Sequence, residues 1–193
     1  MLPSFLFTIP VYLIHSVYVN QIESDIGEIE TLKNLRLKDK NGKTDDRAEQ
    51  NRKIIKEFAL RRMNKELIEE KALDHATDYS GGVLRTMSRL ISTSAVESKI
   101  LGGKKIGQYD MEKGVKREQI KMRRGLTRTH WELLVEIYDN KEIVSDRQEE
   151  KFELLQGLFA LEYINGEEWY NINPLLEKSI QKHKEKYIKS KTL

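Results

Sequence analysis

The binding of an anion near residue 85 is the chemistry that the sequence suggests most directly. The residues Ser80-Gly81-Gly82-Val83-Leu84-Arg85 open a segment with helical periodicity. Glycines let a backbone approach a ligand closely, and a helix N-terminus favours negative charge. Arginine adds a planar, bidentate cation. The alternative is that the serine and glycines simply begin a helix and that Arg85 is a solvated side chain.

Helices must position this arginine, because apolar residues recur at helical spacing from residue 45 onward. The clearest stripe is Val83, Leu84, Met87, Leu90, Ile91 and Ala95, which predicts a helix packed on a core with Ser80 as its N-cap. Two helices precede it, one marked by Ile54, Ile55, Phe58 and Arg62, the other by Leu67 or Ile68, Ala72 and Ala76. A loop over Leu101 to Gly107 then leads to a basic helix over Asp110 to Arg124.

The region after Gly125 has the plan of a winged helix-turn-helix. Thr127 is the N-cap of a helix whose inward side is Trp131, Leu134, Val135 and Tyr138, and Gln148 to Phe159 forms another helix. Asn165-Gly166 predicts a hairpin between Ala160 to Ile164 and Glu167 to Ile172. Pro174 starts a last helix that uses Leu176 and Ile180. Helix, helix and hairpin in this order are typical of the winged fold.

The first residues contain no charged side chain up to Ile22. We interpret Phe5 to Ile9 as a short buried strand, followed by a helix over Tyr12 to Ile26 and a second strand over Glu30 to Leu37, with Leu35 and Leu37 inward and Arg36 outward. A signal peptide would begin with basic residues, and prolines and polar residues disfavour a membrane span. We therefore expect no membrane partner, and a protein anchored in a membrane by residues 1–22 is a third and weaker alternative.

The order of these features resembles the lid and C-terminal domain of AAA+ and STAND-type ATPases. A helix that begins at glycines and carries an arginine in its second turn is followed by a winged helix, and two helices and an apolar Phe7-Thr8-Ile9-Pro10 strand precede it. The resemblance implies a mainly α protein with three parts. These are a two-strand remnant of an α/β ATPase core over 1–44, a helical lid over 45–125 and a winged helix-turn-helix with a basic C-terminal helix over 126–193.

The same resemblance implies roles for individual residues. Arg85 is the lid arginine that reaches the γ-phosphate of ATP, where a guanidinium stabilises developing charge. Gly81 and Gly82 let the backbone approach the phosphates. Thr8 is the polar residue that orients the attacking water, with Ser16 as a second candidate.

The sequence lacks the motifs that this family uses for catalysis. It contains no G-x-x-x-x-G-K-[ST] loop and no apolar strand ending in Asp-Glu, so nothing in it grips the β-phosphate or Mg²⁺. We expect ATP with Mg²⁺ only if an N-terminal ATPase half, supplied by a longer chain or by a partner subunit, provides these parts. The chain is then a nucleotide-sensing and interaction module that does not hydrolyse ATP alone.

A nucleic-acid-binding protein is the alternative function. Ten basic residues against three acidic ones lie between Lys99 and Arg128, and Lys113, Arg117, Lys121 and Arg124 fall near one helix face. Such a face could track a phosphate backbone or an acidic partner, although a solvated charged surface is the more ordinary explanation. The hairpin segment from Leu158 to Leu176 holds three glutamates and no basic residue, which opposes DNA docking there.

Other chemistries find no support. The sequence has no cysteine, which fits a reducing cytoplasm and excludes disulfides and thiolate metal sites. Its four histidines are scattered without metal-ligand spacing, so we expect no metal centre.

Overall fold

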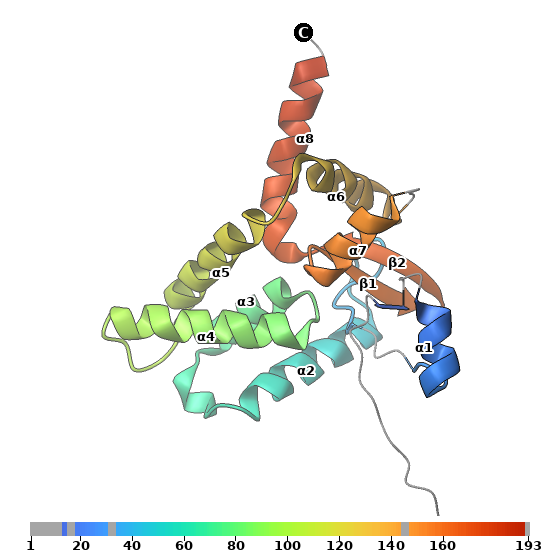
Figure 1. The fold of residues 1–193 in the computed structure, drawn as a ribbon. Helices are drawn as coiled ribbons and strands as arrows, with labels where there is room; N and C mark the ends of the chain where they lie inside the picture. Colours follow the sequence, from blue (N-terminus) through green and yellow to red (C-terminus); the bar gives the residue numbers. More distant parts are fainter. Residues whose placement is uncertain (1–12, 15–17, 31–33, 144–146, 192–193) are drawn as a thin grey trace, which may run out of the picture.

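The computed structural model describes residues 13–14, 18–30, 34–143 and 147–191. Within these ranges the chain forms eight α-helices and one antiparallel hairpin (Figure 1). The mainly helical class is confirmed. The predicted strand at Phe5 to Ile9, together with Thr8 and Ser16, lies outside the described residues.

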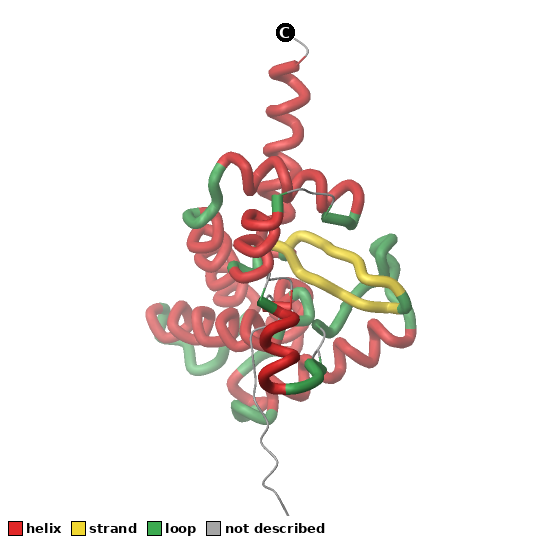
Figure 2. Tube along the Cα trace, turned by 45° about the vertical axis from the view of Figure 1, so that its right-hand side comes forward, coloured by secondary structure: helices red, strands yellow, loops and turns green. Residues whose placement is uncertain are grey.

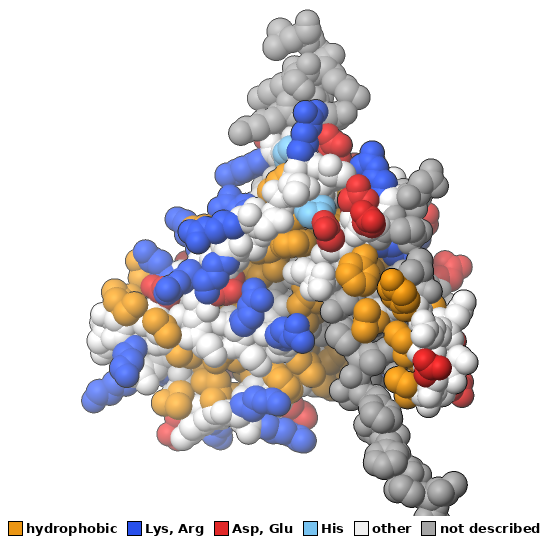
Figure 3. Space-filling view, viewed as in Figure 1, with side chains coloured by type: hydrophobic (Ala, Val, Ile, Leu, Met, Phe, Trp, Pro, Cys, Tyr) orange, Lys and Arg blue, Asp and Glu red, His pale blue; other side chains and the backbone are white. Residues whose placement is uncertain are grey.

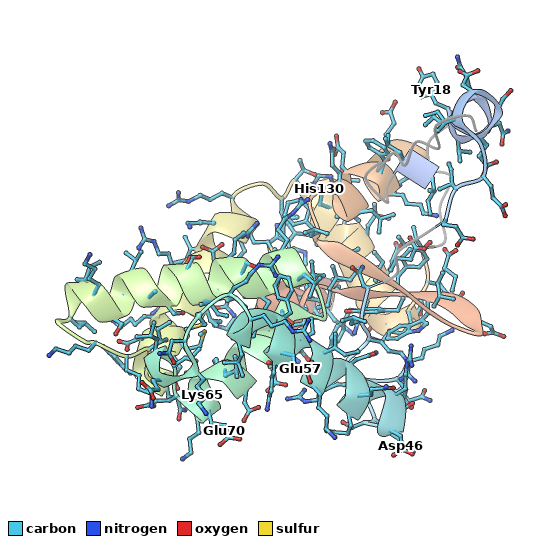
Figure 4. All side chains as sticks on the ribbon, turned by 90° about the horizontal axis from the view of Figure 1, so that it is seen from below. Tyr18, Asp46, Glu57, Lys65, Glu70 and His130 are labelled. Carbon is cyan, nitrogen blue, oxygen red and sulfur yellow. The ribbon has the colours of Figure 1, made fainter. Side chains whose placement is uncertain are left out.

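Four helices build a bundle that carries Arg85. They are α2 (Asp46–Leu60), α3 (Glu70–Ser80), α4 (Leu84–Ile100) and α5 (Gln108–Arg123). Asp45 begins α2 as its N-cap, because its carboxylate accepts the Ala48 N–H at 2.8 Å. Asp110 caps α5 by accepting the Gly107 N–H at 2.9 Å. The helices predicted from periodicity are thus present, with a short 3-10 turn at Lys65–Leu67 before α3. Figure 4 labels Asp46 and Glu57 on α2 and the side chains of Lys65 and Glu70 around that turn.

The inward face of α4 differs from the predicted stripe. Leu84 is 40% exposed and Ala95 is exposed, whereas Ser94 and Ser98 are buried. The reason is Gly114 of α5, where an added β-carbon would overlap the Ser94 hydroxyl. The glycine lets the two helices approach so closely that a small serine, with its hydroxyl donating to the Leu90 carbonyl at 2.7 Å, fits between them.

The C-terminal region contains the elements that the sequence predicts after Gly125. Helices α6 (Arg128–Asn140) and α7 (Gln148–Gln156) precede strands β1 (Ala160–Asn165) and β2 (Glu167–Ile172). A short turn at Pro174–Leu176 leads into α8 (Glu177–Lys191). Thr127 caps α6, as predicted, by accepting the His130 N–H. The His130 ring, labelled in Figure 4, lies 2.7 Å from the Glu153 carboxylate of α7 and joins the two helices.

One hydrophobic core crosses the predicted boundary at residue 125. It contains Ile55 and Met87 of the bundle together with Leu134 and Ile180 of the C-terminal region. Figure 2 shows the hairpin against the surrounding helices. The bundle and the C-terminal region are therefore packed together through a shared interior.

The predicted second strand is wrong. Glu30 and the described residues 34–37 form no strand, and α1 covers only Val19–Ile26 of the helix predicted from Tyr12. Arg36, expected to face outward, is 6% exposed and donates to the Asp45 carboxylate at 2.8 Å. Because Arg36 is held by the cap of α2, this segment follows the bundle instead of pairing with a strand. The Arg36 hydrogen bond and the Ala48 N–H lower the pKa of Asp45.

No helix among the described residues is long and apolar enough to cross a bilayer.

Candidate functional site

The two glycines form the turn between α3 and α4. Gly81 ends α3 in the left-handed conformation with φ 60°, and Gly82 follows with φ 77°. The prediction that Ser80 caps α4 is wrong. Its hydroxyl donates to the Thr77 carbonyl at 2.7 Å and accepts the Gly82 N–H at 3.1 Å, so Ser80 completes the helix before the turn.

Both glycines lie against other parts of the chain. A β-carbon on Gly82 would overlap the carbonyl oxygen of Leu35, and one on Gly81 would lie 2.6 Å from the Leu161 side chain. The Gly81 carbonyl also accepts the Tyr163 hydroxyl at 2.6 Å. This packing accounts for both glycines without a ligand, and their approach to a phosphate stays a prediction.

Arg85 lies in the first turn of α4, because the helix begins at Leu84. This is one turn earlier than predicted. Its side chain is exposed, and no ion pair joins it to another described residue. The guanidinium therefore keeps its donors available at the end of a helix whose dipole favours anions.

Arg85 lines an open groove of about 610 Å³ between the bundle and the C-terminal region. The remaining lining residues are Ser88, Arg89, Ser92 and Thr93 of α4, Glu118, Lys121 and Met122 of α5, Gly125, and Gly157 and Phe159 before β1. The groove thus combines three cations and several hydroxyl groups with one apolar ring. A volume of this size suits a small-molecule ligand.

Glu118 organises the cations of the groove. Its carboxylate is 2% exposed and accepts hydrogen bonds from Arg89 at 3.2 Å, Thr93 at 2.8 Å and Lys121 at 2.7 Å. Burial alone raises the pKa of Glu118, but the hydrogen bonds from Lys121 and Thr93 and the charges of Arg89 and Lys121 outweigh it, so the pKa lies below its ordinary value. The carboxylate is ionised and holds two cations in place, which leaves Arg85 as the groove cation that no described carboxylate engages.

The predicted basic residues of α5 are all exposed, but they do not form one site. Lys113 lies over the Tyr109 ring, with its ammonium 5.3 Å from the ring centroid, Arg117 pairs with Glu97 at 2.9 Å, and Lys121 enters the groove. Arg124 is exposed at the end of α5. Lys and Arg side chains are frequent on the face that α4 and α5 present in Figure 3.

Sequence reasoning missed Arg89 and Glu118. The spacing of four residues from Arg85 to Arg89 indicated a shared helix face, and Glu118 precedes Lys121 by one turn. The hydrogen bond from Arg89 of α4 to Glu118 of α5 depends on how the two helices pack, and no local sequence pattern predicts that packing.

A second cleft of about 890 Å³ lies on another side, where Lys141, Asn171 and Tyr138 meet. The Lys141 ammonium donates to the Tyr138 carbonyl and the Asn171 side chain, both at 2.9 Å. Burial lowers the pKa of Lys141, against the opposing charges of Glu177 and Asp139. The ammonium ties the end of α6 to β2, so its role there is structural.

Among the described residues, no three histidine or carboxylate side chains gather in a way that could hold a metal ion. Comparisons with protein-family models, with curated proteins and with solved structures give no match.

Proposed function

We propose that the chain is the nucleotide-sensing and interaction module of an AAA+/STAND-like ATPase. Helices α2 to α5 act as the lid, and α6 to β2 act as a winged helix packed on it. ATP with Mg²⁺ is held by a P-loop polypeptide, and Arg85 donates to the terminal phosphate.

The observation that carries the proposal is the contrast between Arg85 and its neighbours. All three cations are exposed, but Arg89 and Lys121 form ion pairs with Glu118, whereas Arg85 in the same groove forms none with a described residue. A guanidinium held on a helix end beside a groove is placed to gain a charge-assisted, bidentate contact when a phosphate arrives. Loss of the terminal phosphate would break that contact, which is how such a residue reports hydrolysis.

The contacts between the lid and the hairpin support the second half of the proposal. Val83, directly before α4, is buried with Leu161, Tyr163 and Trp169 of the hairpin. A movement of the start of α4 toward a phosphate would therefore shift Val83 and disturb its packing on β1 and β2. The proposed winged helix serves as the interaction surface and not as a reader of DNA.

The proposed site binds but does not catalyse. Its groups are cations and hydroxyls, and its one carboxylate is buried and already accepts three hydrogen bonds from the chain. The sequence also lacks a P-loop, so we expect no ATP hydrolysis by the chain alone.

A titration of the ¹⁵N-labelled chain with tripolyphosphate at millimolar concentration tests this site by NMR. We expect shifts in the first turn of α4 and in the Arg85 side chain, and a loss of affinity of about tenfold in Arg85→Ala, since one charge-assisted contact disappears. Arg61→Ala is the matched control, because Arg61 is 83% exposed on the far end of α2. Equal affinities of the two variants would contradict the proposal.

Nucleic-acid binding through α5 is the second candidate. It is favoured by the exposure of Lys113, Arg117 and Lys121 of α5 and of Arg124 directly after it, of which Arg117 and Lys121 also form ion pairs within the chain. Fluorescence anisotropy with labelled DNA over a salt series tests it. A contact of this kind predicts an affinity that falls steeply with salt and a smaller salt slope in Lys113→Gln/Arg124→Gln. A slope unchanged by these substitutions would exclude α5 as the surface.

A further inference from the structure

We propose that the end of the bundle where α4 turns into α5 docks on the surface of an anionic phospholipid bilayer. We call this surface the tip. It consists of the apolar residues Val96, Ile100, Leu101 and Tyr109 and the basic residues Lys99, Lys104, Lys105 and Lys113. It lies at the opposite end of α4 from Arg85, so the inference does not depend on the proposed nucleotide site.

The four apolar side chains of the tip are at least half exposed to solvent. Ile100 is 69% exposed, Leu101 61%, Tyr109 59% and Val96 50%. In Figure 3, orange side chains with blue ones around them occupy the left end of the molecule, where Figure 1 shows the junction of α4 and α5. Aliphatic groups gathered on a protruding end mark an interaction surface.

The tip is built as an ordered turn. At the end of α4, the Leu101 N–H donates to the Glu97 carbonyl at 3.2 Å and the Gly103 N–H donates to the Ser98 carbonyl at 2.8 Å. The Ser98 hydroxyl donates to the Lys105 carbonyl at 2.9 Å. Beyond the turn, the buried Ile106 pairs with the segment before α3, and its N–H donates to the Leu67 carbonyl at 2.8 Å. The exposed side chains are thus presented by a backbone that needs little further ordering on binding.

The charge of the tip is positive. Residues 99–109 contain three lysines and no acidic residue. Over 96–113 the four lysines of the tip face three carboxylates, Glu97, Asp110 and Glu112. Each of these carboxylates is engaged by the protein itself: Glu97 pairs with Arg117 at 2.9 Å, Asp110 accepts the Gly107 N–H at 2.9 Å, and Glu112 accepts the Gln108 side-chain amide at 3.0 Å. A surface of this sign is attracted by anionic headgroups.

The composition of the tip favours a lipid surface over a protein or a nucleic acid. Its cations are all lysines, and protein interfaces are enriched in arginine and depleted in lysine. Its exposed apolar groups are mainly aliphatic, whereas single-stranded nucleic acid is bound by stacking on aromatic rings. Aliphatic side chains at the centre with lysines beside them match peripheral insertion, in which apolar groups enter the interface while ammonium groups remain at the headgroups.

Vesicle co-sedimentation of the purified full chain tests the proposal. The probes are vesicles of phosphatidylcholine alone and vesicles of an equimolar mixture of phosphatidylcholine and phosphatidylserine. We expect binding to the mixed vesicles and weak binding to phosphatidylcholine. Ile100→Ser/Leu101→Ser and, separately, Lys104→Gln/Lys105→Gln should each lower binding to the mixed vesicles by about tenfold, because each removes one of the two attractions.

Ile26→Ser is the matched control, because Ile26 is 54% exposed on α1, far from the tip in Figure 1. It should bind vesicles as the unchanged chain does. Thermal unfolding followed by circular dichroism establishes that each variant is folded. The lysine variant changes only exposed side chains, so the test stands even if the apolar variant unfolds.

Three results would overturn the proposal. The first is no binding to mixed vesicles, and the second is binding that neither double substitution reduces. The third is a concentration-dependent dimer that Ile100→Ser/Leu101→Ser abolishes, in a chain that does not bind vesicles. That outcome would make the tip a contact between copies of the chain.

Discussion

The hydroxyl of Tyr163 donates a hydrogen bond to the carbonyl of Gly81 at 2.6 Å. This contact joins strand β1 of the hairpin to the turn that positions α4. The Tyr163 ring also stacks on Trp169 of β2, with ring centroids 4.7 Å apart. Burial raises the pKa of Tyr163, so the phenol keeps its proton and remains a donor at neutral pH. Residues 82 positions apart thus hold the start of α4 in place.

Tyr163→Phe removes this hydrogen bond and leaves the Gly81 carbonyl without its donor. We expect the free energy of unfolding to fall by about 1 to 2 kcal/mol, measured by urea denaturation. Tyr109→Phe is the control, because the Tyr109 side chain is largely exposed. Equal stabilities of the two variants would mean that the contact contributes nothing.

Gly82→Ala should destabilise the protein far more than Gly102→Ala. Both glycines have similar positive φ values, 77° and 75°. An alanine at 102 meets nothing within 4 Å, and one at 82 would overlap the Leu35 carbonyl. The strained conformation costs about 1 kcal/mol at either position, and the steric overlap adds about 2 kcal/mol or more at 82. Comparable denaturation midpoints would show that Leu35 does not lie against the turn.

Gly114→Ala reverses the usual effect of this substitution in a helix. Alanine normally stabilises a helix interior by about 1 kcal/mol relative to glycine. Here the new methyl group would overlap Ser94, so we expect a loss of about 1 to 3 kcal/mol in the unfolding free energy. Ser94→Gly should partly restore stability to the alanine variant in a double-mutant cycle, and additive effects would contradict the close crossing of α4 and α5.

Glu118→Gln should lower the unfolding free energy at neutral pH by about 1 to 3 kcal/mol, because it removes the charge that holds Arg89 and Lys121. The pKa of Glu118 in the folded protein lies below its ordinary value of 4.5. Its contribution is therefore complete above that value and disappears as the pH falls through the folded-state pKa. The stability difference between the unchanged chain and the variant should narrow in acid. A difference that is constant from neutral to acidic pH would show that the ionised carboxylate is not the stabilising form.

The helices and the hairpin could be predicted because their signals are local. Thr127 and Asn165-Gly166 act at their own positions through capping and turn geometry, and the structure places the helix start and the hairpin as predicted. The error at Ser80 has a physical reason. A serine before two glycines can cap the start of the next helix or lie at the end of the preceding one. Here the left-handed conformation of Gly81 ends α3 directly after Ser80.

The features that could not be predicted depend on residues far apart in the sequence. Arg36 carries a charge that normally faces solvent, yet the cap of α2 buries it. Glu118 is one acidic residue in a basic segment of the sequence, and only the packing of α4 on α5 brings Arg89 and Thr93 to it. The predicted apolar stripe of α4 wrongly included Leu84 and Ala95 in the buried face. Instead Ser94 is buried, because Gly114 lets α5 pack closely against it. An isolated glycine inside a helical pattern was the available sign of such a close approach.

The chain alone lacks the P-loop that holds ATP, so any contact with a nucleotide is weak and made through the terminal phosphate. The ratio of the millimolar affinities for ATP and ADP, measured by NMR titration with magnesium chelated, therefore tests the central claim most directly. If Arg85 receives the terminal phosphate, the unchanged chain prefers ATP by about tenfold and Arg85→Ala binds the two nucleotides equally. Arg61→Ala should keep the preference. A preference for ATP that survives in Arg85→Ala, or an unchanged chain that does not distinguish the two nucleotides, would contradict a phosphate-sensing role for this arginine.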